Sequence, residues 1–375
     1  MLFTPLYALY IKIMNNENQT IHKSDDNLTI YGWNEKLNQL KQESIYSTLA
    51  HGRVSIVHRT CYEVISGNGL FQCELTGNMM YGKSDDELPC TGDWVIFQPF
   101  DEHKGIIVDR LPRERTLYRK KSGTVADKQA IASYVDKAFI VQSLDDNFNV
   151  RRVERFMVQI MEENISSVLV LNKADLDFDR QSVEEQIKHI SSQIPVFFTS
   201  IHQLETIVRL RKSISEGETV VFVGSSGVGK SSLVNALCEK PVLLTSDISL
   251  STGKGRHTST RREMVLMDSS GVLIDTPGVR EFGLAIDNPD SLTEMFEISD
   301  YAESCRFSDC KHIDEPGCAV LEAVHNGTLD HKVYESYLKL RREAWHFSAS
   351  EHEKRKKEKS FTKLVEEVKK RKANF

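Results

Sequence analysis

A nine-residue segment has the residue types and spacing needed to hold a nucleoside triphosphate. Its residues are Gly224, Ser225, Ser226, Gly227, Val228, Gly229, Lys230, Ser231 and Ser232. The glycines permit a turn that points backbone N–H groups at a phosphate, and the lysine reaches the β- and γ-phosphates. The Ser231 hydroxyl is of the type that coordinates Mg²⁺. Because an apolar run precedes this segment and a helical pattern follows it, we predict a phosphate-binding loop.

A second motif could read the base of the nucleotide. It consists of Asn172, Lys173, Ala174 and Asp175, at the end of another apolar run. The Asp175 carboxylate can accept hydrogen bonds from guanine N1–H and the 2-amino group, whereas adenine would leave that carboxylate unpaired. Thr199 and Ser200, also after a predicted strand, are expected in the loop that receives guanine O6. Alone, these four residues could be an ordinary strand-end turn, but beside the phosphate loop they indicate GTP.

The order of the two motifs is itself informative. In ordinary small GTPases the base-reading motif follows the phosphate loop, whereas here Asn172 precedes Gly224 in the chain. All parts of a GTP site are present, but in a rearranged order. We therefore predict a circularly permuted GTPase domain.

The expected Mg²⁺ and switch residues follow the phosphate loop. Asp275 and Gly278 begin and end the sequence DTPG, in which the carboxylate would hold Mg²⁺ through water and the glycine amide would sense the γ-phosphate. Upstream, Thr258 is the candidate for a second Mg²⁺ hydroxyl ligand, in a loop that the γ-phosphate would order. His257 beside it is a catalytic candidate that could position water, or an ordinary loop residue.

One residue type is missing from the expected catalytic set. After Gly278, where many GTPases carry a glutamine that positions water, this chain has Val279. Since valine cannot orient water by hydrogen bonding, we expect slow intrinsic hydrolysis and a missing group supplied by the switch or by a partner. Gly227 stands where potassium-dependent relatives have asparagine, so the sequence gives no argument for K⁺ activation.

A third cluster has metal-ligand spacing. Cys305, Cys310, His312 and Cys318 form the pattern C-x4-C-x-H-x5-C. Three thiolates and one imidazole suit tetrahedral zinc, and four protein ligands leave no open position for chemistry. We therefore predict a structural zinc site; the alternative is buried cysteines beside a surface histidine.

The elements that must position these residues divide the chain into five parts. Residues 1–44 are expected to be a flexible leader with a short helix, and a helix could run from Tyr31 to Ala50. Five short alternating segments in residues 45–115 predict an OB-fold β-barrel, although an SH3-like barrel would give much the same pattern. Residues 116–287 form the predicted GTPase domain, 288–350 a zinc-binding helical domain, and 351–375 a basic helix or tail.

The GTPase part has the alternation of an α/β domain. The runs 138–141 and 167–171 are continuously apolar, as in strands buried on both faces of a parallel sheet, and helical spacing separates them. Runs at 196–198, 220–223 and 272–274 extend the sheet. We expect a mostly parallel sheet covered by helices.

Charge and cysteine content limit the partners. The net charge of −6 argues against a generic nucleic-acid coat, but residues 339–375 carry thirteen Lys/Arg and six Asp/Glu, or +7, which leaves −13 for the rest. The basic tail could neutralise RNA phosphates or be a solvated helix face. Seven cysteines, three of them at metal spacing, suit a cytoplasmic protein. The apolar residues 1–13 are too short to cross a bilayer and lack a basic n-region, so no membrane partner is expected; Met14 is an alternative start.

The combination resembles a known family, the circularly permuted, small-ribosomal-subunit-dependent GTPases of bacterial ribosome biogenesis (the RsgA/YjeQ family). The resemblance covers about residues 45–345 and is carried by the motif order, by GRHT at 255–258, TGDWV at 91–95 and HIDEPGC at 312–318. Ser259 departs from the threonine usual in the family. The resemblance implies a late-acting assembly factor, expected to be a monomer, that binds the small (30S) subunit and its rRNA. It would hydrolyse GTP under stimulation by the subunit and then leave.

Two other classes of function stay open. An RNA-binding scaffold could hold guanine nucleotide as a structural or regulatory ligand, although it would not need the full Mg²⁺ set of Ser231, Thr258 and Asp275. A signalling or translation-cycle GTPase is less compatible with the zinc segment and the basic tail.

Overall fold

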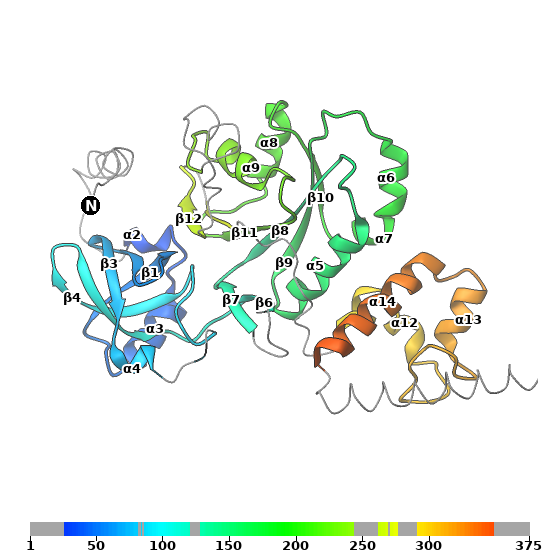
Figure 1. Ribbon diagram of the computed structural model, residues 1–375, viewed down its shortest axis with the longest axis horizontal. Coiled ribbons are helices and arrows are strands. Elements are labelled where there is room, and N and C mark those ends of the chain that lie inside the picture. Colours follow the sequence, from blue (N-terminus) through cyan, green and yellow to red (C-terminus); the bar gives the residue numbers. More distant parts are fainter. Residues whose placement is uncertain are drawn as a thin grey trace, which may run out of the picture.

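Three parts follow one another in the structure: a barrel, a sheet covered by helices, and a small helical segment (Figure 1). This computed structural model describes residues 26–81, 84, 86–120, 128–243, 262–268, 271–276 and 291–348. Within these ranges no helix has both the length and the apolar character needed to cross a membrane.

The predicted five-stranded barrel is confirmed. Its strands pair in the order β1-β2-β3-β5-β4, and a further pairing of β1 with β4 closes the sheet on itself. The strands are β1 (Ala50–Val57), β2 (Tyr62–Ser66), β3 (Gly69–Leu75), β4 (Trp94–Asp101) and β5 (Lys104–Arg110). The interior holds the alternate apolar residues expected of a small barrel, among them Val54, Phe97 and Ile107. A short helix, α4 (Gly77–Met80), follows β3.

The helix predicted over residues 31–50 is wrong in its length. The structure has a turn of helix, α2 (Asp26–Thr29), and then α3 (Glu35–Glu43). Helix α3 begins after Asn34, whose side chain accepts a hydrogen bond from the Leu37 N–H at 3.1 Å. It ends at Glu43; the next residue, Ser44, is extended, and turns over residues 44–49 lead into β1.

A second set of strands forms the predicted mostly parallel sheet. Their order is β10-β9-β8-β11-β13-β12, and every pairing in this part is parallel except that of β12 with β13. The strands are β8 (Lys137–Ser143), β9 (Ser166–Asn172), β10 (Val196–Thr199), β11 (Thr219–Val223), β12 (Glu263–Leu266) and β13 (Val272–Asp275). Because parallel strands end at the same edge of a sheet, the residues that follow β8, β9, β10, β11 and β13 come together there.

Helices cover both faces of this sheet (Figure 1). One face packs against α5 (Val150–Glu162), α6 (Arg180–Gln186) and α7 (Lys188–Ser191). The other packs against α8 (Leu204–Arg211) and α9 (Lys230–Leu237). The continuous apolar runs seen in the sequence therefore correspond to strands buried on both faces.

A hairpin between the barrel and the sheet was not predicted. Its strands are β6 (Leu117–Lys120) and β7 (Lys128–Ala132), and the side-chain amide of Gln159 on α5 donates to the Tyr118 carbonyl. Strand β12 was also missed, and a pairing of Glu263 with Ile56 connects it to the barrel strand β1. The barrel and the GTPase sheet are thus one continuous hydrogen-bonded sheet.

A buried arginine fixes the joint between the barrel and the sheet. Arg53 of β1 is 1% exposed, and its guanidinium donates to the Gly92 carbonyl at 3.0 Å and to the Thr219 hydroxyl at 2.9 Å. Its charge lies 5.5 Å from the ring centre of Trp94. Burial lowers the pKa of Arg53 to about 10, so the group stays charged at neutral pH. The barrel is thereby attached to the first residue of β11, the strand that leads into the glycine-rich loop.

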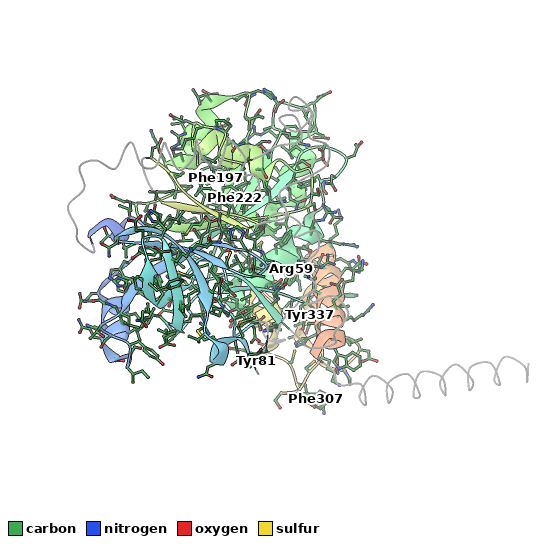
Figure 2. The ribbon with its side chains drawn as sticks, turned by 60° about the vertical axis from the view of Figure 1, so that its left-hand side comes forward. Arg59, Tyr81, Phe197, Phe222, Phe307 and Tyr337 are labelled. Carbon is green, nitrogen blue, oxygen red and sulfur yellow. The ribbon has the colours of Figure 1, made fainter. Side chains whose placement is uncertain are left out.

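The C-terminal segment is helical, as predicted, and packs against the sheet domain. It contains α11 (Ser291–Met295), α12 (Ser299–Ala302), α13 (Ala319–His325) and α14 (His331–Ser348). Tyr337 lies on α14 (Figure 2). It is buried, and its ring centre is 6.2 Å from that of Phe296. Arg155 of α5 and Glu343 of α14 form an ion pair at 2.9 Å. The helix next to β8 and β9 therefore also supports the cysteine-bearing segment.

Candidate functional site

The glycine-rich loop lies between β11 and α9, and two of its positions require glycine. Gly224 has φ +147° and Gly229 has φ +94°. A Cβ atom at Gly224 would lie 2.3 Å from the Val141 carbonyl oxygen, and one at Gly229 would lie 2.4 Å from Nδ2 of Asn172. Any side chain at either position would displace the neighbouring segment, so these two glycines set the shape of the loop.

The lysine of the loop is held inside it. Lys230 is 8% exposed, and its ammonium donates to the carbonyls of Gly224 at 2.8 Å and Ser225 at 2.9 Å. Burial lowers the pKa of Lys230, although the nearby Asp275 carboxylate opposes that shift. The cation is therefore already beside the loop's backbone, where an anion held by the loop would meet it.

Ser231 of α9 and Asp275 of β13 come together at this edge of the sheet. The Ser231 hydroxyl donates to Oδ2 of Asp275 at 2.7 Å, and the contact exists because β11 and β13 are parallel neighbours, with Phe222 opposite Asp275. Asp275 is 2% exposed, and its Oδ1 has no hydrogen-bond partner among the described residues. Burial raises the pKa of Asp275, against the opposing hydrogen bond from Ser231. A buried carboxylate oxygen without a partner beside a hydroxyl fits the hard oxygen ligands that Mg²⁺ takes.

Asn172 joins three segments at the same edge of the sheet. Its Nδ2 donates to the Val228 carbonyl at 2.9 Å, and its Oδ1 accepts from the Thr199 hydroxyl at 3.3 Å. Thr199 and Ser200 are buried at the end of β10. The Ser200 hydroxyl donates to the exposed Asp175 carboxylate at 2.5 Å, and this hydrogen bond lowers the pKa of Asp175. Asp175 is therefore an ionised acceptor, oriented by the neighbouring loop.

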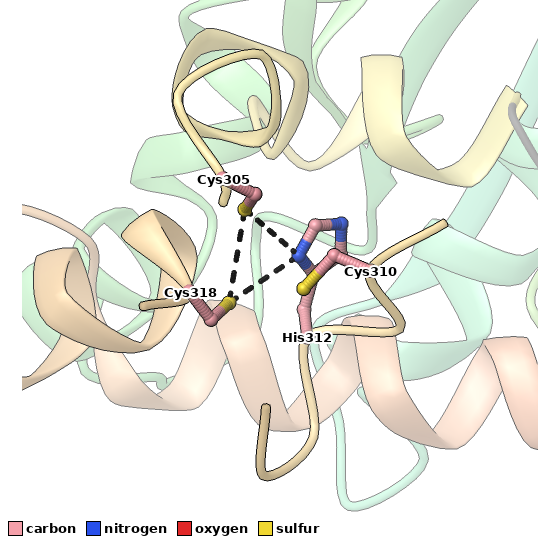
Figure 3. A group of neighbouring side chains, drawn as sticks. All are labelled: Cys305, Cys310, His312 and Cys318. Atoms are coloured by element: carbon pink, nitrogen blue, oxygen red, sulfur yellow. Dashed lines mark hydrogen bonds between the residues drawn. The ribbon is translucent and has the colours of Figure 1, made fainter. Parts of the chain in front are cut away.

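The predicted zinc ligands form one compact cluster, shown in Figure 3. The donor atoms of Cys305, Cys310, His312 and Cys318 all lie within 4.8 Å of one another. Nδ1 of His312 is 3.5 Å from the Cys305 sulfur and 3.4 Å from the Cys318 sulfur, and these two sulfurs are 3.9 Å apart. A tetrahedron with zinc–sulfur bonds of about 2.3 Å has edges of about 3.8 Å. The spacing therefore fits tetrahedral zinc.

Neighbouring groups hold the loop that bears His312. Tyr334 donates its hydroxyl to the His312 carbonyl at 2.6 Å. The Glu315 carboxylate accepts the backbone N–H groups of Lys311 at 3.0 Å and Ile313 at 2.9 Å. These backbone hydrogen bonds, of which that from Ile313 has the largest effect, lower the pKa of Glu315 to about 2. Supporting contacts of this kind orient metal ligands before a metal binds.

Comparison with known proteins identifies the family. A relative from Bacteroides thetaiotaomicron, named small ribosomal subunit biogenesis GTPase RsgA 1, is 79% identical over 362 residues, which cover 96% of this chain and 100% of the relative. The chain belongs to the RsgA GTPase family. The family model for RsgA GTPase matches residues 110–285, and the model for 50S ribosome-binding GTPase matches residues 219–372. An RsgA from Methanosarcina acetivorans is 38% identical over 338 residues, which cover 87% of this chain and 89% of that relative.

Solved structures agree with this fold. The YjeQ structure from Thermotoga maritima superposes on this RsgA GTPase with a TM-score of 0.60 and 28% identity, over 79% of this chain and 98% of the other. YloQ, described as a circularly permuted GTPase, has a TM-score of 0.57 over 80% of this chain and 97% of its own, and at 22% identity it supports the fold alone. The barrel, the permuted GTPase sheet and the cysteine–histidine segment are thus the architecture predicted from the sequence.

The site residues named from the sequence divide into two groups. The structure of this RsgA GTPase brings together the loop from Gly224 to Ser232, the base motif, the Thr199–Ser200 pair and Asp275. Thr258, His257 and Gly278 lie outside the described residues, as do Ser259, Val279 and the basic residues beyond 350.

Sequence reasoning missed one residue at this edge. Asp145, just after β8, forms an ion pair with Lys173 at 2.8 Å. The signal was an acidic residue two positions after a buried strand of a parallel sheet.

Proposed function

We propose that this RsgA GTPase binds the small ribosomal subunit late in its assembly and hydrolyses GTP to GDP and phosphate when the subunit stimulates it. Hydrolysis would promote maturation of the subunit and release of assembly factors. The observation that carries the catalytic part is the meeting of Lys230, Ser231 and Asp275 at the sheet edge that also holds the guanine motif. The family, and the name of the relative that is 79% identical, support the subunit as partner.

The phosphates of GTP would lie in the loop from Gly224 to Ser232. Its N–H groups and the N-terminus of α9 would face the β-phosphate, where the helix dipole favours negative charge. Lys230 would give up its hydrogen bonds to the Gly224 and Ser225 carbonyls for the β- and γ-phosphate oxygens. The lysine needs only a small movement, because its ammonium already lies among these backbone groups.

Ser231 and Asp275 fit a Mg²⁺ ion bound with the nucleotide. When bound, Mg²⁺ would neutralise charge on the phosphate oxygens. The 2.7 Å hydrogen bond between the two residues would open, which frees the hydroxyl oxygen for the ion and leaves the carboxylate to hold a water of its shell. Thr258 is the proposed second hydroxyl ligand, and Gly278 the proposed sensor of the γ-phosphate. His257 is the candidate catalytic group.

The base would be read by Asp175, with Asn172 setting its distance from the phosphates. The carboxylate would accept from guanine N1–H and the 2-amino group, and the Thr199–Ser200 loop would receive O6. Because Asn172 donates to the Val228 carbonyl of the phosphate loop, the base-reading and phosphate-binding segments would keep a fixed separation.

The remaining parts would serve the contact with the subunit. Zinc bound by Cys305, Cys310, His312 and Cys318 would supply folding energy to a polar segment and no chemistry. We propose that rRNA is contacted by a monomer in the cytoplasm, with the barrel, the zinc segment and the basic tail beyond residue 350 as candidate surfaces.

The alternative is an RNA-binding scaffold in which guanine nucleotide is a structural ligand. Steady-state GTP turnover at fixed salt, with and without purified small subunits, separates the two. We expect strong stimulation by the small subunit and none by the large one, and Lys230→Ala should lose tight GTP binding. Equal turnover under both conditions would favour the scaffold. Asp175→Asn should weaken the preference for guanine, and an unchanged preference would move base recognition elsewhere.

A further inference from the structure

An ion pair lies beside the proposed guanine site and has no part in the roles assigned so far. Lys173, the second residue of the base motif, has φ +62° and follows directly on β9. Its ammonium is 2.8 Å from Oδ2 of Asp145, which follows β8. The lysine side chain therefore extends from the end of one strand to the end of its neighbour, along the edge where the base motif lies.

The carboxylate that holds this lysine is itself fixed. Oδ1 of Asp145 accepts a hydrogen bond from the Ser143 hydroxyl at 2.6 Å and from the Asn147 N–H at 3.0 Å. The strand ends are also tied together, because the Leu144 N–H donates to the Asn172 carbonyl at 2.9 Å. Although burial opposes it, the hydrogen bonds from Lys173 and Ser143 lower the pKa of Asp145 to about 2. Asp145 therefore keeps its charge throughout the physiological range.

The contact matters because Lys173 lies between two residues of the base motif. Asn172 on one side holds the phosphate loop through the Val228 carbonyl, and Asp175, two residues further on, is the proposed base reader. A free lysine side chain samples many rotamers, and ordering it on nucleotide binding would cost affinity. An ion pair present before the nucleotide arrives removes part of that cost.

We propose that Asp145 is a positioning residue for guanine-nucleotide binding, which acts by holding the Lys173 side chain across the ends of β8 and β9. The inference rests on the proposed nucleotide site. It assigns to Asp145 a role in affinity, with no contact to the reacting atoms. The pair is about one-third exposed on each side, at 36% for Lys173 and 31% for Asp145, so its effect should be modest and sensitive to salt.

The test is equilibrium binding of a fluorescent GDP analogue, N-methylanthraniloyl-GDP, to the full-length protein. Asp145→Asn removes the charge but keeps an oxygen for Ser143 and Asn147. We expect the dissociation constant to rise about two- to fivefold, the range of a partly exposed ion pair, with less effect at high salt. Asp146→Asn is the matched control, since Asp146 is the exposed neighbour, and it should bind as the wild type does.

A double-mutant cycle decides whether the effect passes through the lysine. In a Lys173→Met background, Asp145→Asn should change the dissociation constant no further. A full effect in that background would mean that Asp145 only stabilises the strand end, and wild-type affinity for Asp145→Asn alone would also overturn the proposal. Failure of the proposed site is a different result: Asp175→Asn would then keep its preference for guanine, whatever Asp145→Asn does.

Discussion

Gly229→Ala tests whether the phosphate loop and the base motif are locked together as described. The change introduces two costs. The residue has φ +94°, and a left-handed backbone conformation costs a non-glycine residue about 1–2 kcal/mol. The new Cβ would also lie 2.4 Å from Nδ2 of Asn172, which would break that group's hydrogen bond to the Val228 carbonyl. A buried polar group left unpaired costs about 1–3 kcal/mol.

Gly227→Ala separates these two costs. Gly227 also has a positive φ, +84°, but a Cβ there would meet no atom within 4 Å. Gly227→Ala should therefore lower the free energy of unfolding only by the backbone term, about 1–2 kcal/mol. Gly229→Ala should lower it by about 2–5 kcal/mol, because both terms apply. Each kcal/mol should lower the thermal midpoint by about 2–4 °C in a domain of this size.

The assay is thermal unfolding of the nucleotide-free protein, so that lost ligand binding does not contribute. Asn172→Ala provides the decisive background, because it removes the atom that the new Cβ would strike. In that background Gly229→Ala should lower the thermal midpoint by no more than Gly227→Ala does. Equal losses for the two glycine variants in the wild-type background would refute the steric argument.

Two further results follow from the site. Asp275→Asn should stabilise the nucleotide-free protein near pH 7 while it abolishes Mg²⁺-dependent GTP turnover. Burial raises the pKa of Asp275, so its ionised form destabilises the fold. The higher thermal midpoint of Asp275→Asn should therefore be fully present above that raised pKa. It should vanish as the pH falls below the ordinary value of 3.8. Cys310→Ser should lose bound zinc, measured by elemental analysis, and should increase hydrogen exchange in α13. Cys61→Ser, in the barrel and outside the cluster, should keep the wild-type zinc content and exchange. Zinc retained by Cys310→Ser would contradict the assigned ligand set.

The local motifs could be predicted from the sequence because each has its ligands or its backbone requirements within a few residues. The predicted zinc donors occupy residues 305–318, and the predicted phosphate loop is one contiguous segment. The strands around them were also predictable, since runs such as 138–141 are apolar without interruption and only a sheet covered on both faces buries them. The five barrel strands were predictable because each shows alternating apolar and polar residues and is bounded by turn residues, both of which are local signals.

Where the prediction failed, the deciding contacts were distant in the chain. The helix expected to reach Ala50 stops at Glu43, because Ala50 already belongs to β1, which pairs with β2 and β4. Strand β12 is short and borders β13, and nothing in its own residues shows that it pairs antiparallel there and touches the barrel at Ile56. These outcomes depend on the partners that the fold supplies.

The sequence by itself determined which chemistry this RsgA GTPase carries, and the tertiary structure decided which groups meet. Lys230, Asp175 and the cysteine spacing indicate a phosphate site, a proposed guanine reader and a candidate metal cluster from the sequence alone. The hydrogen bonds from Ser231 to Asp275, from Asn172 to Val228 and from Lys173 to Asp145 exist only because parallel strands end at one edge. The physical reason is range: spacing along the chain fixes local geometry, whereas contacts between distant segments depend on how the whole sheet packs.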